Sequence, residues 1–401
     1  MPITISGPVG ITDVNGTAAA PAITGTDTDS GMFFGTNTVA LGTNGTSAVS
    51  VDASQNATFN STGALTLPVG TTTQRPTAAA GQLRYNSTTG YPEYYTGTYW
   101  ALVSTGINAS PTQKAIFGYG NNGNNTIFYS VTNLVSNTGV VATDTTGVGT
   151  ARTTYASAAG YGTDKAIFAY GYTGANVSMS NLVSNTGVVA ADVTGVGTAR
   201  RANAAAGYGD NKAIFGYGLT TVVVSLTNLV SSTGVVATDT TGVGSARYIL
   251  AATGYGADKA IFGYGATATT PTAASMTNLV SNTGVVATDT TGVGTARYQV
   301  AAARYGGDKA IFGYGASGGN VSMTNLVSNT GVVSADVTGV GTARNAPGAA
   351  GYGSDKAIFG YGNAGGGSSM TNLVSNTGVV SADVTGVGTA RVELGAAGYG
   401  L

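Results

Sequence analysis

The segment LVSNTGVVATDTTGVGTAR occupies residues 134–152 and returns without a single change at residues 279–297. It belongs to a longer unit, whose most constant element, KAIFGYG or KAIFAYG, begins six times, at Lys114, Lys165, Lys212, Lys259, Lys309 and Lys356. The element that ends in Ala-Arg also closes six times, in steps of 48, 47, 50, 47 and 47 residues. Because self-similarity at such a period is the signature of a repeat architecture, the chain from residue 106 to residue 401 predicts six copies of one supersecondary unit.

Each unit divides into short segments rich in Val, Ala, Tyr and Thr, separated by Gly or Asn-Thr-Gly, which are strand and turn signals. We expect four strands per unit: one after the Arg, such as residues 248–256, then KAIFGYG, MTNLVS and GVVATD. The KAIFGYG strand carries apolar residues on both alternating faces, so it must be covered on both sides. Four short strands in about 45–50 residues match a propeller blade. The sequence therefore predicts a six-bladed β-propeller with four-stranded blades; an open solenoid is the alternative.

The two ends of the repeat array are offset by one strand. The array begins at residue 113 with a KAIFGYG strand that no first strand precedes, and it finishes with RVELGAAGYGL, a first strand that no KAIFGYG follows. Pairing of this last strand with the first KAIFGYG strand leaves no unpaired edge. We therefore expect the C-terminal segment to supply the inner strand of blade one.

The unit resembles the repeat of kelch β-propellers across residues 106–401. The likeness lies in the Arg at the start of the inner strand, the small-residue strand and the aliphatic strand that ends in glycine. Kelch blades usually carry a Gly-Gly pair and a later Trp, whereas this chain has Gly-Tyr-Gly and no Trp after Trp100. The resemblance implies the propeller fold, but no functional residue of a kelch enzyme carries over.

Residues 1–60 contain 15 Leu, Ile, Val, Phe or Met residues, too few for an independent monomeric core. Two stretches, APAITGTDTDSGMFFGTNTVALGTNGTSAVSVDASQNATF and LPVGTTTQRPTAAAGQLRYNSTTGYPEYYTGTYWALVS, resemble segments of bacteriophage tail-fibre and virion-fibre proteins. The resemblance implies a β-rich homotrimer, in which three chains bury together what one cannot. We predict a virion-anchoring, trimerising segment at residues 1–60, a small β-hairpin fibre domain at 61–105 and the propeller at 106–401. A disordered Thr/Gly linker is the alternative for residues 1–60.

Composition excludes several classes of function. Only 8% of the residues are charged, 16 Lys and Arg nearly balance 17 Asp and Glu, and no basic run exists to neutralise phosphates, so we expect no nucleic-acid partner. The absence of cysteine and histidine excludes disulfides, thiolate or imidazole metal sites and His-based triads. The N-terminus lacks the basic and apolar regions of a signal peptide, so we expect assembly in a host cytoplasm. We predict no cofactor, no metal site and no enzyme activity.

One Asp and one Arg recur in every unit, with the Asp eight residues before the Arg. A group present six times by symmetry is more often structural than catalytic, so we interpret these residues as structural loop pairs that fix the connection between blades. Coordination of Ca²⁺ or another hard cation in a central channel is the alternative. The pairs are Asp144 and Arg152, Asp192 and Arg200, Asp239 and Arg247, Asp289 and Arg297, Asp336 and Arg344, and Asp383 and Arg391.

The six copies differ mainly in two places, the 8 or 11 residues that follow KAIFGYG and the residues that follow each Arg. Since strands alternate in direction within a blade, both variable segments map to one face, opposite the constant GYGxDK and SNTG turns. Aromatic and amide groups can stack on sugar rings and bond hydroxyls, so we predict a receptor-binding face there. The candidate contacts are Asn124, Asn125, Phe128, Tyr129, Tyr155, Tyr172, Asn176, Tyr248 and Tyr298, with Arg201 as the one unpaired cation.

These observations predict a phage fibre on the virion. Its N-terminus is expected to bind tail, baseplate or head-vertex proteins, and its propeller to bind a host-surface glycan or outer-membrane receptor. A head fibre or capsid decoration protein is the alternative. A polysaccharide-degrading enzyme is a further alternative, for which the sequence supplies no carboxylate pair at a unique position.

Overall fold

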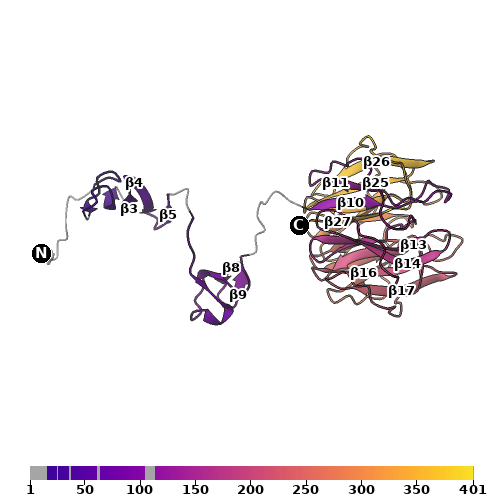
Figure 1. Cartoon of the computed structure of the whole chain (residues 1–401), viewed down its shortest axis with the longest axis horizontal. Coiled ribbons are helices and arrows are strands. Elements are labelled where there is room, and N and C mark those ends of the chain that lie inside the picture. Colours follow the sequence, from indigo (N-terminus) through magenta and orange to yellow (C-terminus); the bar gives the residue numbers. More distant parts are fainter. Residues whose placement is uncertain (1–15, 25, 36–37, 61–63, 104–112, 401) are drawn as a thin grey trace. The chain divides into compact units, whose positions relative to one another are not determined.

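The computed structural model describes residues 16–24, 26–35, 38–60, 64–103 and 113–400. The described residues form β-strands joined by turns, with one short 3-10 helix and no α-helix, which confirms the all-β prediction. The chain divides into two compact units, Met1–Ile107 and Asn108–Leu401, which we call the N-terminal unit and the C-terminal unit (Figure 1). The predicted boundary between residues 105 and 106 lies outside the described residues.

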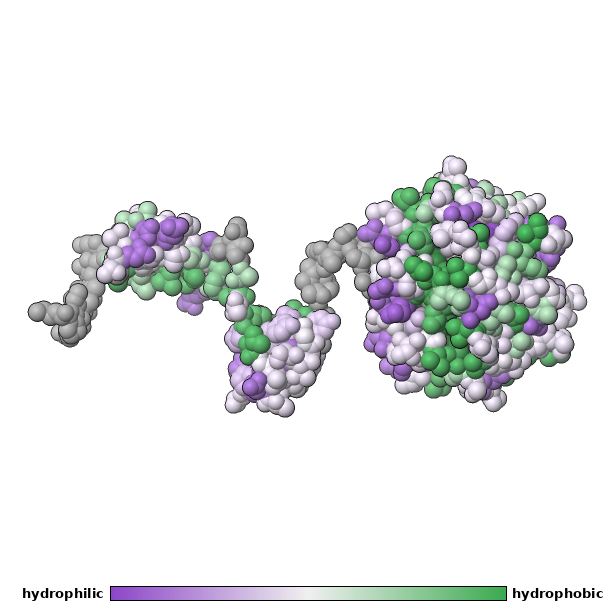
Figure 2. Space-filling model, viewed as in Figure 1, coloured by the Kyte–Doolittle hydropathy of each residue, from purple (hydrophilic) through white to green (hydrophobic). Residues whose placement is uncertain are grey.

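The first sheet of the N-terminal unit has five antiparallel strands in sequence order. They are β1 (Ile23–Thr24), β2 (Gly31–Gly35), β3 (Thr38–Thr43), β4 (Thr46–Val51) and β5 (Ala57–Phe59). The segment before β1 packs against one face, where a side chain at Gly42 would meet the carbonyl oxygen of Ala18 at 3.2 Å. Hydrophobic residues gather along the other side of the sheet (Figure 2). The two faces of this sheet therefore differ: one is covered by the segment before β1, and the other carries hydrophobic residues.

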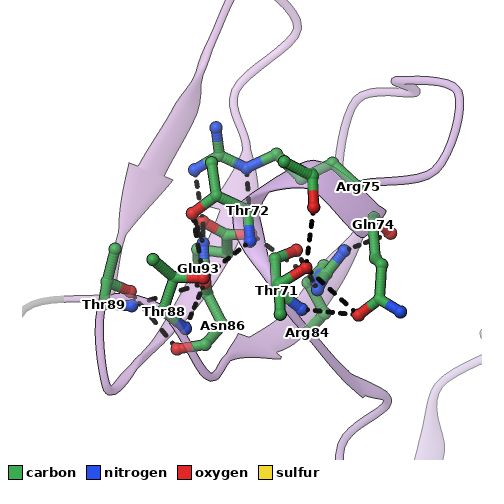
Figure 3. A network of polar contacts seen from close by, with 10 residues as sticks. Thr71, Thr72, Gln74, Arg75, Arg84, Asn86, Thr88, Thr89 and Glu93 are labelled. Atoms are coloured by element: carbon green, nitrogen blue, oxygen red, sulfur yellow. Dashed lines mark hydrogen bonds and ion pairs between the residues drawn. The ribbon is translucent and has the colours of Figure 1, made fainter.

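The second sheet of the N-terminal unit surrounds a polar network (Figure 3). Its elements are β6 (Val69–Gly70), η1 (Thr72–Gln74), β7 (Leu83–Asn86), β8 (Tyr91–Tyr95) and β9 (Trp100–Leu102). Glu93 is fully buried and accepts hydrogen bonds from Arg75 Nη2 at 2.6 Å and from Asn86 Nδ2 at 2.9 Å. The hydrogen bonds from Arg75 hold the pKa of Glu93 below its usual value, so the buried carboxylate remains ionised and paired at neutral pH.

The C-terminal unit contains six three-stranded antiparallel sheets. Sheet I is β27 (Gly395–Tyr399), β10 (Lys114–Gly118) and β11 (Thr132–Val135); sheet II is β12 (Ala158–Tyr161), β13 (Lys165–Tyr172) and β14 (Asn176–Val183); sheet III is β15 (Ala204–Tyr208), β16 (Lys212–Leu219) and β17 (Val223–Val230). Sheet IV is β18 (Ala251–Tyr255), β19 (Lys259–Gly263) and β20 (Thr277–Val280); sheet V is β21 (Ala301–Tyr305), β22 (Lys309–Gly313) and β23 (Thr324–Val327); sheet VI is β24 (Gly348–Tyr352), β25 (Lys356–Asn363) and β26 (Gly367–Val374).

The predicted fourth strand of each unit is not formed as a strand. The GVVATD segment joins its sheet only through isolated bridges, such as Val135 with Val141 and Thr132 with Thr145. Between these bridges the side chain of Asn133 donates to the carbonyl oxygen of Ala142 at 3.0 Å, so a side chain takes the place of a ladder partner. The prediction of four-stranded units is wrong in this respect.

The last strand of the chain completes the first sheet of the repeat array. β10 pairs with β27 in antiparallel register, with Lys114 opposite Tyr399, as the strand offset predicted (Figure 1). Contacts between first strands run from β12 through β15, β18, β21, β24 and β27 and return to β12. Backbone hydrogen bonds follow the same order: Ile249 to Ala202, Gln299 to Ile249, Ala346 to Gln299, Glu393 to Ala346 and Tyr155 to Glu393.

The core lies between neighbouring sheets, and the KAIFGYG strand contributes to both sides. In β16, Ala213 and Phe215 pack toward sheet II, while Ile214 and Tyr217 pack toward sheet IV. Tyr217 follows a register shift and has a positive φ of 64°, and this bulge turns its ring to the side of Ile214. Its ring meets the edge of Phe262 of the next sheet at 5.1 Å, and the other five sheets repeat this contact.

Deletion of residues 391–401 tests the pairing of β10 with β27. We expect the C-terminal unit to lose cooperative unfolding, because β10 loses one of its two partner strands and two neighbouring sheets lose a covering strand. Calorimetry and circular dichroism on heating measure this loss, with removal of Leu401 alone as the control. A truncated chain that melts within about a degree or two of the intact chain contradicts the role of β27.

Candidate functional site

Both variable segments lie at the same end of each sheet. The residue that follows each Arg forms an isolated bridge with the end of the second strand, as Arg201 does with Leu219 and Thr153 with Tyr172. The connection from second to third strand leaves from that same point. We call this the loop end; the opposite end, with the GYGxDK and SNTG turns, is the turn end. The variable residues therefore gather at the loop ends, as predicted.

Beneath the loop end, each repeated Arg is fully buried and joins two sheets. Arg200 Nη2 donates to Asn228 Oδ1 at 2.7 Å, and Arg200 Nε donates to the carbonyl oxygen of Tyr217 at 2.8 Å, both within sheet III. The guanidinium also lies 4.2 Å from the ring centre of Tyr170, which belongs to sheet II. Each of the other five repeated Arg residues likewise stacks on a Tyr ring.

The partner of each Arg is not the Asp eight residues before it. Arg200 Nη1 lies 3.8 Å from Asp239, and Arg152 Nη1 lies 3.9 Å from Asp192, so in five of the six sheets the Asp pairs with the Arg at the start of its own sheet. The physical reason is that Asp192 ends sheet II, whereas Arg200 has already crossed into sheet III. The closing pair of the series is Arg391 with Asp144, at 3.6 Å.

The Asp carboxylate also fixes the connection between sheets. Asp239 accepts hydrogen bonds from the backbone nitrogen of Thr198 at 3.0 Å and from its hydroxyl at 2.6 Å. Burial raises the pKa of Asp239, but hydrogen bonds from Thr198 and Asn228 outweigh it and hold the pKa below the usual value. Burial lowers the pKa of Arg200. The loop-pair residues are thus structural in their contacts, although the Asp contacts the Arg at the start of its own sheet and not the Arg eight residues after it.

Replacement of Asp239 by Asn tests this clamp. We expect the free energy of unfolding to fall by about 1–3 kcal/mol at neutral pH, because charge-assisted hydrogen bonds from Thr198 are lost. Since the folded-state pKa of Asp239 is lowered, its stabilisation is present above the ordinary value of 3.8 and is lost as the pH falls through the folded-state pKa. The difference between the two proteins in chemical denaturation should therefore shrink on acidification.

The control is Asp355→Asn, which removes a surface pair with Lys356 at 2.8 Å. It should change the free energy of unfolding by less than about 1 kcal/mol. Equal effects of the two substitutions contradict the clamp.

Three predicted contact residues form a continuous row at the loop ends of sheets I to III. The ring of Phe128 meets that of Tyr172 in an edge contact at 6.1 Å. The Arg201 guanidinium lies 4.5 Å from the ring centre of Tyr172, and its Nη1 donates to Asn176 Oδ1 at 3.5 Å. Arg201 is therefore not the unpaired cation that the sequence suggested, because an aromatic face and an amide oxygen already hold it.

Glu393 is a residue of this end that the sequence analysis missed. It is half-buried, and its Oε2 accepts a hydrogen bond from Asn121 Nδ2 at 2.6 Å, which in turn donates to Asn125 Oδ1 at 3.0 Å. Burial raises the pKa of Glu393, while hydrogen bonds from Tyr155 and Asn121 and the charge of Arg201 oppose the rise. The available signal was its uniqueness, since residues 106–401 contain no other glutamate.

The remaining predicted contacts differ in exposure. Asn124 and Asn125 are exposed, whereas Tyr129, Tyr155 and Tyr298 are half-buried. Tyr248 is only 8% exposed and donates to the carbonyl oxygen of Thr269 at 3.2 Å. The prediction of Tyr248 as an exposed contact is wrong, because its ring packs in an apolar cluster with Leu219 and Ile249.

The Glu393→Gln substitution tests the half-buried carboxylate of Glu393. Because the folded-state pKa lies above the ordinary 4.5, the folded protein binds this proton more tightly and loses stability as the pH rises from 4.5 to the folded-state pKa. The melting temperature of the variant relative to the parent should therefore rise across that interval and then level off. Glu93→Gln is the control: because the pKa of Glu93 is lowered, the melting temperature of this variant relative to the parent should fall, not rise, as the pH increases through the acidic range. A flat difference for Glu393→Gln contradicts a raised pKa.

A cavity of about 220 Å³ lies among the first strands of the six sheets. Small residues form most of its wall, and Lys165, Lys212, Asp210 and Arg304 contribute charged groups. The six repeated Asp residues are not among the lining residues, so they offer no ligands to a cation in this space. Within the described ranges, no three His, Cys, Asp or Glu side chains gather into a possible metal site.

A second cavity of about 10 Å³ lies beneath the loop ends, lined by Leu250, Val300, Pro347 and Leu394 among others. It has room for about one water molecule, so contacts at the loop ends must form on the outer surface. Among the described residues, no helix has the length and apolar character to cross a membrane.

Comparison with known proteins identifies no relative: no protein-family model matches the chain, and no curated protein matches it.

Proposed function

We propose that this chain is a bacteriophage fibre protein that binds a glycan on the host surface. In this proposal the N-terminal unit trimerises and attaches to other virion proteins, and the C-terminal unit is a six-bladed β-propeller that recognises the receptor. The return of first-strand contacts from β27 to β12 supports the propeller. The likeness of residues 20–104 to phage fibre segments supports the virion location.

The observation that carries the proposal is the separation of constant and variable residues. The buried clamps and inter-sheet aromatic contacts use the repeated residues, whereas the residues that differ between units gather at the loop ends. Loops on a rigid scaffold can change without loss of packing, and binding residues concentrate there for that reason. This distribution is typical of a recognition surface.

The chemistry of the loop ends suits an uncharged or weakly charged glycan. The row of Phe128, Tyr172 and Arg201 offers flat surfaces on which sugar rings can stack. Asn124 and Asn125 offer exposed amide groups for hydroxyls. Three sites on one homotrimer raise the effective affinity by about 100-fold or more, so weak single sites suffice.

The proposed activity is binding without catalysis. Hydrolysis of a glycosidic bond ordinarily needs two carboxylates on either side of the bond. The C-terminal unit has one glutamate, Glu393, and five of the six repeated Asp residues pair with a buried Arg.

Exchange of one loop tests the recognition surface. Replacement of NNGNNTIFYSV, residues 121–131, by NAGGGSSM, residues 363–370, keeps an asparagine at the position that contacts Glu393 and uses a loop that sheet VI already accommodates. Stability should change little, but adsorption of particles to host cells should fall about tenfold or more, because Phe128, Tyr129 and the exposed asparagines are lost.

The matched control is Asp355→Asn with Lys356→Gln at the turn end, which should leave adsorption unchanged. If the control abolishes adsorption and the loop exchange does not, the assignment of the recognition surface to the loop end is wrong. Shortened host glycans after incubation with the protein would contradict binding without catalysis.

A further inference from the structure

The first sheet of the N-terminal unit presents an apolar row that crosses all five strands. The strand register places Ile23 beside Met32, Met32 beside Leu41, Leu41 beside Val49 and Val49 beside Phe59. Because alternate residues of a strand share a face, a second row joins Phe34, Val39, Val51 and Ala57 on the same side. We call these two rows the apolar face.

No described residue covers the apolar face. Ile23 is 49% exposed, Leu41 46% and Phe59 57%. Hydrophobic residues are seen along this side of the sheet in Figure 2. The opposite face differs, because the segment before β1 packs on it and Ala40 is only 3% exposed. Five strands in one layer with an open apolar face do not make a core, since a stable domain needs a second layer.

The composition of the face selects its partner. None of the residues in β1 to β5 is charged, and residues 1–60 contain no Lys or Arg, so the surface offers nothing to a charged partner. A second copy of the same face is apolar and uncharged in the same way. Identical faces can meet around a symmetry axis, and most soluble homo-oligomers are built in this manner.

The area of the face is compatible with association of copies of this chain. Its nine partly exposed apolar side chains leave roughly 400 Å² of apolar surface per chain, given about 60–120 Å² for a fully exposed aliphatic side chain. A dimer would bury roughly 800 Å² in one pair of chains, and a trimer roughly 1,200 Å² divided among three pairs. The area therefore does not distinguish two copies from three, and the copy number is taken from the proposed fibre.

We propose that the apolar face of β1 to β5 is the interface through which three copies of this chain associate, with Leu41 and Val49 near the centre of the buried surface. The inference rests on the proposed fibre only for the copy number of the homotrimer; the surface itself follows from the strand register and the exposure of its side chains.

The absence of cysteine allows a direct test in the full-length chain, because one introduced thiol is a unique reporter. Leu41→Cys places the thiol on the apolar face. Thr58→Cys is the matched control, because Thr58 lies opposite Ser50 on the other face and is exposed. The rate of reaction of each thiol with a maleimide is measured on the native protein and after denaturation, together with the molar mass from light scattering.

We expect a trimer in which Cys at position 41 reacts about tenfold or more slowly than Cys at position 58, with equal rates after denaturation. Equal rates in the native protein would overturn the interface. Protection of position 41 in a monomer would mean that another part of the same chain covers the apolar face, which overturns the interface. Protection in a dimer would overturn the copy number. A trimer that protects position 41 but does not adsorb to host cells would contradict the proposed function and still support this interface.

Discussion

Six buried guanidinium groups determine how the C-terminal unit is held together. Each one donates hydrogen bonds to the sheet that follows it in the chain and stacks on a tyrosine of the sheet before. Removal of a partner leaves the buried charge with less compensation, which is costly. The Asp that pairs with the Arg also requires a glycine beside it: Gly197 has a φ of 74°, and a side chain there would collide with the Asp239 carboxylate. The near-verbatim repetition follows, since each unit must supply the same set of partners.

That constraint also explains where the units are free to differ. The connection between second and third strands lies beyond the clamp and varies in length, with either 8 or 11 residues. The buried Arg nevertheless contacts an Asn side chain in all six sheets. At the loop ends of sheets I to III, Phe128, Tyr172 and Arg201 contact one another across sheet boundaries. Variable residues from separate units therefore form one surface, which no unit could form alone.

Much of the fold could be predicted from the sequence, because the strand and turn signals repeat six times and the offset at the two ends specifies the pairing of β10 with β27. What could not be predicted depends on which residues the folded chain brings together. Asp192 and Arg200 are close in the chain, yet they belong to different sheets, so spacing suggested the wrong partner. The positions of Phe128, Tyr172 and Arg201 at the loop end were predictable from strand direction. The burial of Tyr248 and the contact of Glu393 with Asn121 were not, because they depend on how neighbouring loops pack.

The pairing of β10 with β27 has a consequence for synthesis of the chain. Lys114 leaves the ribosome long before Tyr399, its partner in the register. At about 5–20 residues per second, the wait is roughly 15–60 s, whereas a hairpin of adjacent strands forms in microseconds. During that interval sheet I has an open edge that can pair with another nascent chain. The repeats carry little charge to keep two nascent chains apart. The speed with which β27 pairs with β10, more than the stability of any one sheet, therefore decides whether a chain closes on itself or pairs with another chain.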